Sequence, residues 1–254
     1  MQATDSWERL LGGKRLVAVA GAGGKKSTMY ALASRCPGRA GLTTTVNCPY
    51  PPDGLQAQVV IGEEAMLLEA VKAAPRDCRR VFFARPGKRA DLTAGIRPEL
   101  VTQIHTARVF DLLLVKADGA RRRLIKAPAD GEPIYPAGTE LVLYVVSAHA
   151  LGRKLDSGVA HRVDEFTALT GATEETVIGG EHIVKLLTSP AGALKGVGPE
   201  ARVVAVMNRV DTPARYRQSR DIAGQVLSAS PRFSGVVLGC MGDPVPWMEF
   251  IERS

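Results

Sequence analysis

The sequence predicts an α/β fold, in which a doubly wound and mostly parallel sheet carries helices on both faces. Short apolar runs alternate with segments of helical pattern along the whole chain, as in parallel sheets with crossover helices. The clearest runs, residues 17–20 and 111–115, have the near-continuous apolar character of strands buried on both faces. Glycines, hydroxyls or carboxylates follow several of these runs, and such sheets bind ligands at those strand ends.

The composition narrows the class of protein. The chain has 254 residues, 45% of them hydrophobic, and we expect one domain over residues 1–254. No apolar run reaches the ~18 residues of a membrane span, and the N-terminus lacks the basic and apolar segments of a signal peptide. Four scattered cysteines without a C-x-x-C pair fit a reducing compartment. We therefore expect a cytoplasmic protein with no membrane partner; the oligomeric state is left open.

The net charge of the chain indicates which kinds of ligand it would bind. A net charge of +7 suits anionic ligands, but it is spread along the chain. Aromatic residues make up only 5% of the sequence, too few for the base-stacking surfaces of many nucleic-acid-binding proteins. A small anionic ligand is therefore expected, and nucleic acid is not.

The helices are predicted from apolar periodicity and from their end signals. Residues 1–13 form a short helix or an arm that ends at Gly12 and Gly13, and the next helix continues to residue 34 before Pro37. Residues 63–74 carry apolar side chains on one face, and the helix at 98–106 begins with proline, whose missing N–H costs nothing there. Further helices are expected at residues 163–169, 182–187, 213–228 and 247–252.

The remaining segments divide into strands and loops. Besides the two clearest runs, strands are expected at residues 41–46, 59–61, 79–84, 140–146, 202–207 and 236–238. Prolines make residues 47–53 and 127–138 loops, and residues 85–89 a basic, solvated turn. The glycine-containing segment 149–162 is expected to be irregular.

The stretch after the first buried strand has the composition of a phosphate-binding loop. Gly21, Ala22, Gly23 and Gly24 allow positive φ and close approach of a ligand to the backbone. The following residues, Lys25, Lys26, Ser27 and Thr28, would form the first helical turn, where free N–H groups and the helix dipole attract anions. Nucleotide phosphates and their Mg²⁺ are bound by loops of this kind, in which a strand is followed by a glycine loop, a lysine and a hydroxyl residue.

The loop is a variant of the G-x-x-x-x-G-K-[ST] pattern, so two readings of its lysines stay open. If Lys25 holds the phosphate, Gly24 precedes it correctly, but Val19 stands at the first glycine position and Lys26 at the hydroxyl position. If Lys26 holds the phosphate, Ser27 follows correctly but Lys25 replaces a glycine. The dinucleotide pattern G-x-G-x-x-G fits less well, and a tight turn with two solvated lysines is the structural alternative.

Polar residues at two further strand ends are candidates for the same site. Asp118 follows the strand at 111–115, where a carboxylate would bind Mg²⁺ or orient water, although a turn or N-cap aspartate is the alternative. Nearby, Arg122 and Lys126 belong to a basic run that would clamp a substrate anion or form a solvated face. Hydroxyls at the other strand end are further anion candidates unless they reflect β propensity alone: Thr43, Thr44 and Thr45.

A fourth strand end carries Asn208, Arg209, Val210 and Asp211. The pattern N-K-x-D at such a place reads guanine in GTP-binding proteins: the aspartate accepts hydrogen bonds from the base, and the asparagine holds neighbouring loops. Arg209 stands at the lysine position, and its planar guanidinium would stack on the base. An N-cap for the helix at 213–228 is the alternative.

These motifs together resemble the YqeC family. The resemblance spans nearly the whole chain in the right order and rests on the glycine loop, the triple threonine, and these further pieces: Ala117-Asp118-Gly119, Lys126-Ala127-Pro128, Glu132-Pro133, His161-Arg162, residues 192–196 and residues 208–211. It implies a P-loop NTPase-like fold and an accessory role in maturing selenium-dependent molybdenum hydroxylases.

Four positions depart from the pattern of that family. Lys26 and Ser27 follow Lys25 where threonines are usual, Lys116 stands where a glutamate is usual, and Arg209 replaces lysine. A lysine at 116 removes a carboxylate from the neighbourhood of a metal. The departures bear on Mg²⁺ geometry and hydrolysis more than on nucleotide binding.

The first hypothesis is therefore a nucleoside-triphosphate-binding accessory protein, a slow NTPase using GTP or ATP with Mg²⁺. Lys25 and Asp118 would be its catalytic groups, and Ser27, with Thr28 as the alternative, would face the metal beside Asp118. The partner would be a selenium-dependent molybdenum hydroxylase. The alternatives are a non-hydrolysing nucleotide-binding chaperone or adaptor, and a kinase or transferase acting on a small anion.

Overall fold

The computed structural model describes residues 3–253. Most strands of these residues form one eleven-stranded sheet, and β8 (Ile125–Lys126) and β10 (Ala160–His161) make a separate parallel pair. The strands of the main sheet are β1 (Leu16–Gly21), β2 (Ala40–Thr44), β3 (Cys48–Pro49), β4 (Gln58–Ile61), β5 (Arg80–Pro86), β6 (Leu92–Ala94), β7 (Leu112–Lys116), β9 (Leu141–Ser147), β11 (Arg202–Asn208), β12 (Phe233–Cys240) and β13 (Trp247–Glu252).

The sheet is parallel through its centre and antiparallel at its margins. Its strand order is β13-β12-β11-β9-β1-β7-β2-β5-β6-β3, and β4 also pairs with β5. The strands from β12 to β5 are parallel, whereas β13, β6 and β3 join antiparallel. Central β1 lies between β7 and β9, and the chain winds outward on both sides of it. A doubly wound sheet of this kind opens a crevice at the carboxyl ends of its central strands.

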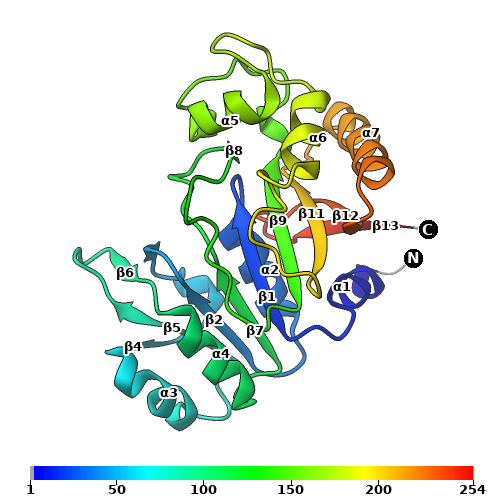
Figure 1. Ribbon diagram of the computed structural model, residues 1–254. Helices are drawn as coiled ribbons and strands as arrows, with labels where there is room; N and C mark the ends of the chain where they lie inside the picture. Colours follow the sequence, from blue (N-terminus) through cyan, green and yellow to red (C-terminus); the bar gives the residue numbers. More distant parts are fainter. Residues whose placement is uncertain (1–2, 254) are drawn as a thin grey trace.

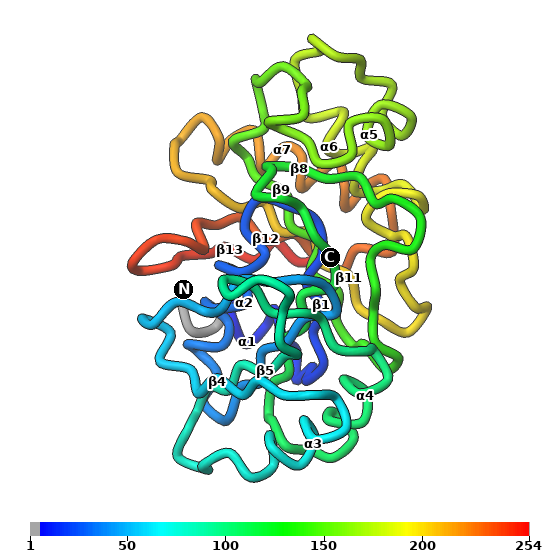
Figure 2. The backbone as a smooth tube through the Cα atoms, turned by 90° about the vertical axis from the view of Figure 1, so that its left-hand side faces the viewer, coloured from blue at the N-terminus to red at the C-terminus, as the bar shows by residue number. Residues whose placement is uncertain are grey.

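Helices cover both faces of the sheet (Figure 1). Helices α1 (Ala3–Leu11) and α2 (Lys25–Arg35) pack on the face that carries Val17 and Val19. The opposite face holds α3 (Glu64–Ala73) and α4 (Pro98–Thr106) towards β5. It also holds α5 (Val163–Thr170), α6 (Gly180–Thr188) and α7 (Pro213–Ala229) towards β11. The molecule is elongated across the strands of the sheet, with α3 and α4 at one end and α5 to α7 at the other (Figure 2). The expected doubly wound α/β fold is thus confirmed.

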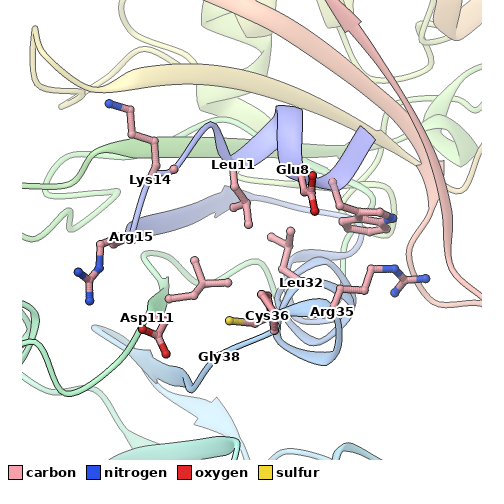
Figure 3. A pocket seen from close by; sticks show the side chains of 13 residues that line it. Glu8, Leu11, Lys14, Arg15, Leu32, Arg35, Cys36, Gly38 and Asp111 are labelled. Carbon is pink, nitrogen blue, oxygen red and sulfur yellow. The ribbon is translucent and has the colours of Figure 1, made fainter. Parts of the chain in front are cut away.

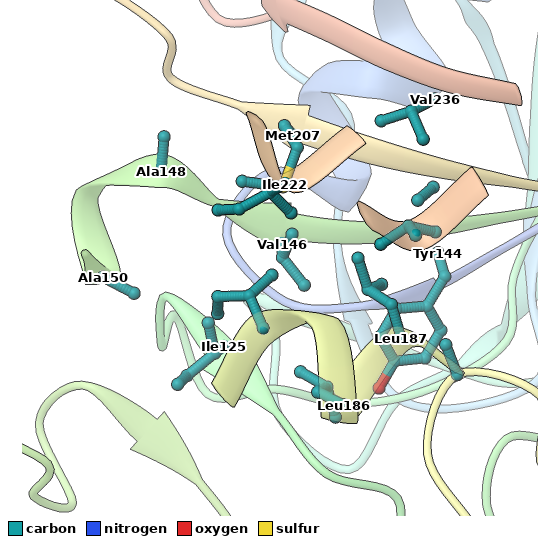
Figure 4. Close-up of a cluster of buried hydrophobic side chains, with 14 of the residues drawn as sticks. Ile125, Tyr144, Val146, Ala148, Ala150, Leu186, Leu187, Met207, Ile222 and Val236 are labelled. Carbon is teal, nitrogen blue, oxygen red and sulfur yellow. The ribbon is translucent and has the colours of Figure 1, made fainter. Parts of the chain in front are cut away.

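The core beneath α6 and α7 supports the centre of the sheet. Leu186 and Leu187 of α6 and Ile222 of α7 lie over the β9 residues Tyr144 and Val146, all of them buried (Figure 4). The Tyr144 hydroxyl donates a 2.8 Å hydrogen bond to the Lys126 carbonyl, so this buried polar group is satisfied. Packing on both faces leaves the loops at the strand ends as the parts free to carry function.

Several expected elements need correction. Residues 247–252 form a strand, β13, not a terminal helix: buried Met248 and Phe250 alternate with more exposed neighbours, and the segment pairs antiparallel with β12. The proline-rich segment 47–53 is not wholly loop, because its first part contains the two-residue β3. The strand expected at 236–238 is longer, and Arg85 and Pro86 belong to β5, not to the turn after it.

The cysteines and the helix lengths bear on two further expectations. All four cysteines are free and form no disulfide bond. None of the helices within residues 3–253 is long and apolar enough to cross a membrane.

Candidate functional site

The glycine loop lies at the centre of the carboxyl edge of the sheet. It joins β1 to α2, and the register of β1 with its neighbours sets Val19 beside Lys116 of β7 and Gly21 beside Val145 of β9. Because β7 ends two residues before Asp118, the carboxylate predicted from the sequence reaches the same edge. The loop and Asp118 are therefore neighbours through parallel pairing of distant segments.

Each of the three loop glycines has a positive φ and no room for a Cβ atom. At Gly21 (φ 88°) a Cβ would lie 2.2 Å from the carbonyl oxygen of Val145, and at Gly24 (φ 144°) 1.9 Å from the side-chain nitrogen of Asn208. At Gly23 (φ 80°) a Cβ would lie 2.5 Å from the carbonyl oxygen of Leu124. The sequence uses glycine here because both the backbone conformation and the close neighbours exclude a side chain.

The loop leaves a row of backbone donors free. Among the described residues, the amide groups of residues 23–27 make no hydrogen bond, and no side chain caps α2 at its N-cap, Gly24. The first amide that bonds into the helix is that of Thr28, to the Gly24 carbonyl at 2.9 Å. Unbonded amides at a helix N-terminus form a ready site for an anion.

Lys25 and Asp118 form a buried ion pair beneath this row. The Lys25 ammonium lies 2.8 Å from one carboxylate oxygen of Asp118 and also donates to the Gly21 carbonyl. The second oxygen of Asp118 accepts a 3.1 Å hydrogen bond from the Gly21 amide. The side-chain exposures are 6% and 0%. Burial lowers the pKa of Lys25, and the attraction of Asp118 opposes that shift.

A second buried lysine shares the same carboxylate. Lys126 is fully buried, and its ammonium lies 3.1 Å from Asp118, 2.8 Å from Glu132 and 2.6 Å from the Gly119 carbonyl. Glu132 is also 3.7 Å from Arg162, which follows β10. Lys126, expected as a substrate-anion candidate, is thus surrounded by protein acceptors and holds Asp118 in place. Glu132 entered the sequence analysis only as part of a motif of the family resemblance, because a single carboxylate in a proline-rich loop carries no spacing signal of its own.

The other residues of the first helical turn face different neighbours. Thr28 is fully buried, and its hydroxyl donates to the Gly24 carbonyl at 3.0 Å, so it does not face a ligand. Lys26 and Ser27 are half-buried, and Ser27 lines a cavity of about 430 Å³ with Tyr30 and residues 241–246. The two expected metal ligands thus have different surroundings: Ser27 lines this cavity, whereas Asp118 is paired with Lys25.

The metal-binding capacity of the site rests on one carboxylate. The described residues contain no group of three histidine, cysteine, aspartate or glutamate side chains that could hold a metal ion. Mg²⁺ in nucleotide sites is held mainly by phosphates, waters and one or two carboxylates, which Asp118 fits once it is freed from Lys25.

The triple threonine is engaged by the backbone. Thr43 donates to the Phe83 carbonyl at 2.7 Å, Thr44 to that of Val46 at 2.7 Å, and Thr45 to that of Ile134 at 3.1 Å. These hydroxyls hold β2 to its neighbours instead of facing an open site. The remaining anion candidate, Arg122, is exposed and has a positive φ of 62°.

Lys116 ends β7 beside these threonines. It is buried, and its ammonium donates to the Asn47 carbonyl at 3.0 Å. Burial lowers the pKa of Lys116 to about 8. Within residues 3–253 no carboxylate lies at ion-pair distance from it, in contrast to Lys25 and Lys126.

Asn208 joins two loops of the site. Its side-chain nitrogen donates to the Gly23 carbonyl at 2.7 Å, and its oxygen accepts from the Met241 amide at 2.9 Å. The glycine loop is thereby tied to the loop after β12. The sequence could not predict this contact of Met241, because the residue contributes its backbone amide, which every residue except proline has.

Asp211 lies at the surface near the same edge. Its carboxylate is 2.6 Å from His149 and 2.6 Å from Arg215. Burial is the largest single influence and raises the pKa of Asp211, but the hydrogen bonds and charges of His149 and Arg215 together outweigh it and lower that pKa. Arg209 is exposed, with a positive φ of 60°. His149 begins the segment expected to be irregular and was not a candidate site residue; the pairing of β9 with β11 brings it to Asp211.

A cavity larger than the one beside Ser27 lies at the other end of the sheet. It has a volume of about 730 Å³ and is bounded by α1, the end of α2 and the beginnings of β1 and β7 (Figure 3). Its lining includes Trp7, Leu11, Leu32 and Cys36, and none of the residues expected to form the site. The candidate site is thus defined by its chemistry and not by the largest volume.

Comparisons with known proteins show to which family the chain belongs. The family described as YqeC protein matches residues 17–164, which include the glycine loop, Asp118 and Lys126. The uncharacterized protein YqeC of Escherichia coli (strain K12) is 32% identical over 197 residues, covering 76% of this chain and 75% of the relative. No solved structure matches. The chain belongs to the YqeC family.

Proposed function

We propose that this protein binds a nucleoside triphosphate at the glycine loop, as an accessory protein with slow or no hydrolysis of its own. The observation that carries the proposal is the row of unbonded amides at residues 23–27 above the Lys25–Asp118 ion pair. Five free donors at a helix N-terminus with a lysine beneath them match the charge and geometry of a phosphate chain.

Lys25 is the phosphate lysine in this proposal. Its ammonium already lies within the loop, whereas Lys26 is half-buried beside it. A bound triphosphate would compete with Asp118 for the Lys25 ammonium, since both offer negatively charged oxygens. The freed oxygen of Asp118 would then face Mg²⁺ carried by the phosphates, while Lys126 keeps the carboxylate in place. Bound Mg²⁺ would supply neutralisation of phosphate charge.

GTP is the first candidate among the triphosphates. Asn208 ties the glycine loop to residue 241, the role that the N-K-x-D pattern gives to its asparagine. Asp211 lies at the strand end expected for the base-reading carboxylate, although His149 and Arg215 now occupy it. The cavity beside Ser27 and Tyr30 lies next to the loop and has room for part of a nucleoside.

The physiological role is proposed from the family resemblance. Nucleotide binding would drive the maturation of a selenium-dependent molybdenum hydroxylase, with that enzyme as the partner. A second candidate, binding without turnover as a chaperone or adaptor, is favoured by Lys26 at the hydroxyl position and by Ser27, which lines a cavity that does not include Asp118. Steady-state phosphate release with the partner present separates the two.

Calorimetric titration with GTP and ATP, each with and without Mg²⁺, tests the proposal. We expect Mg²⁺-dependent binding that favours GTP, and loss of that preference in Asp211→Asn. Preference for ATP would discard the role of Asp211 and keep the phosphate loop. Failure of both nucleotides to bind would overturn the proposed function.

A further inference from the structure

A basic cavity lies at the carboxyl edge of the sheet on the far side of β2 from the glycine loop. It has a volume of about 480 Å³, within the range of small-molecule sites, and it lies where β5 turns into β6. Its lining includes Asn47, Glu63, Arg85, Lys88, Arg89 and Leu92. Strands β7, β2 and β5 follow β1 in the sheet, so three strand spacings place it about 14 Å from the glycine loop.

The turn that carries these cations is tightly held. A Cβ atom at Gly87 would lie 2.2 Å from the Leu92 carbonyl oxygen, so the two strands meet closely there. Arg85 donates to the Gly95 carbonyl at 3.0 Å, and the Thr93 hydroxyl donates to the Cys48 carbonyl at 2.9 Å. The basic residues are therefore displayed by a fixed hairpin and not by a free loop.

The positive charges of the cavity are only partly balanced. Arg89 is paired with Asp91 at 2.9 Å, and Arg85 lies 3.8 Å from Glu64, a carboxylate that Arg97 also contacts. Among the described residues, the Lys88 ammonium has neither a hydrogen bond nor an ion pair. An anion entering the cavity would meet Lys88 and the exposed part of Arg85 without displacing a strong partner.

The buried Lys116 lies directly behind the cavity wall. Its acceptor is the carbonyl of Asn47, and Asn47 lines the cavity. No described carboxylate lies at ion-pair distance from this ammonium, and the attraction of Asp118 offsets its burial only in part, so added negative charge would be favourable. The threonines and Lys126, in contrast, are already satisfied within the protein, which leaves this cavity as the better place for a substrate anion.

We propose that the cavity between β5 and β6 is a second ligand site, which takes a small organic molecule bearing a phosphate group. Arg85 and Lys88 contact the phosphate, and Lys116 adds positive charge from the inner side. Glu63 accepts a hydrogen bond from a hydroxyl or amino group of the same molecule. The site stands on its own contacts; only its pairing with a bound nucleotide, as two subsites of one edge, rests on the proposed function.

Titration with inorganic pyrophosphate by calorimetry tests this site. Wild type is expected to bind two equivalents, one at each site. The double variant Arg85→Gln with Lys88→Gln should weaken one binding event at least tenfold and leave the other unchanged. Lys25→Ala should do the reverse. The matched control, Lys72→Gln with Arg76→Gln on and just after α3, removes the same charge from an exposed surface and should leave both events unchanged.

The outcomes separate this proposal from the proposed function. One binding event that responds to the cavity variant and not to Lys25→Ala supports the second site and contradicts the phosphate loop. Binding that is the same in the cavity variant and in the control overturns the second site. Because Arg85 also contacts the backbone, Lys88→Gln alone is the second variant, and it should still weaken that event severalfold. Lys116→Met should weaken the same event, and Lys116→Arg should restore most of it.

Discussion

The two ends of the central strands differ in what they offer a ligand. The amino end has the larger cavity, about 730 Å³, but two of its charged groups already have partners. Arg35 stacks over Trp7 and donates to the Pro246 carbonyl, and Asp111 accepts from the Arg39 amide. The carboxyl end has smaller cavities, free amides and a lysine beneath them. The volume of a cavity shows only where packed helices leave space. Binding of a polar ligand also requires unsatisfied polar groups that converge on one point.

The difference arises from the geometry of parallel strands. Every crossover connection starts at the carboxyl edge, so loops from four distant segments meet there: the glycine loop and those beginning at residues 117, 148 and 209. At the amino end, polar groups of the returning segments bond to each other: the Arg15 amide donates to Glu140, and the Arg39 amide donates to Asp111. Variants that act on one end and not on the other therefore test the comparison.

The largest effect is expected from Gly21→Ala. The new Cβ would lie 2.2 Å from the Val145 carbonyl oxygen in a backbone conformation with φ of 88°, so strain and overlap add. We expect a loss of about 3 kcal/mol or more in the free energy of unfolding, measured by chemical denaturation. Gly13→Ala, also at positive φ (74°) but with nothing within 4 Å, is the matched control and should lose less. Equal losses would show that the close contact at the loop does not exist.

Lys25→Ala should have the next largest effect, on ligand affinity. We expect triphosphate binding to weaken by about 100-fold, which corresponds to about 2.7 kcal/mol, because the ammonium within the loop is lost. Lys26→Ala should weaken binding by less than tenfold, since that side chain stays half-buried beside the loop. Calorimetric titration of both variants decides the order. The opposite order would assign the phosphate to Lys26.

Lys116→Met should stabilise the protein at neutral pH. Burial lowers the pKa of Lys116 from 10.5 to about 8, so between these values the unfolded chain binds more protons than the folded one. Stability of the wild type is therefore reduced below pH 8 and recovers as the pH rises to 10.5. We expect a gain of about 2 kcal/mol for the variant at pH 7, after allowing for the lost hydrogen bond to Asn47.

Denaturation at pH 7, 9 and 10.5, without nucleotide and Mg²⁺, measures this gain. It should shrink steadily across the series. A variant less stable than wild type at pH 7 would mean that the contact with Asn47 outweighs the burial of the charge.

The smallest effect is expected at the amino end. Leu11→Trp would fill part of the cavity shown in Figure 3 without reaching the carboxyl edge. Triphosphate affinity should remain within twofold of wild type in a calorimetric titration. A tenfold loss of affinity would contradict the view that only the carboxyl end binds the nucleotide, because it would link the larger cavity to that binding.

Local sequence was sufficient where a conformation depends on near neighbours. The glycine run needs positive φ whatever surrounds it, and a buried parallel strand has to be apolar on both faces, so β1, β7 and the loop between β1 and α2 were predictable. The placement of Asp118 and Asn208 at strand ends followed from the same alternation of strands and helices.

Long-range contacts decided what local pattern left open. The six residues of β13 carry too few periods to separate a strand from a helix, and it is pairing with β12 that makes them a strand. The roles of the cations were equally open: Lys126 is buried on Asp118 and Glu132, whereas the basic turn after β5 lines a cavity. Sequence alone determined which residues reach the carboxyl edge. Only the tertiary structure decided which of them satisfy each other and which stay free, because that depends on strand register between segments far apart in the chain.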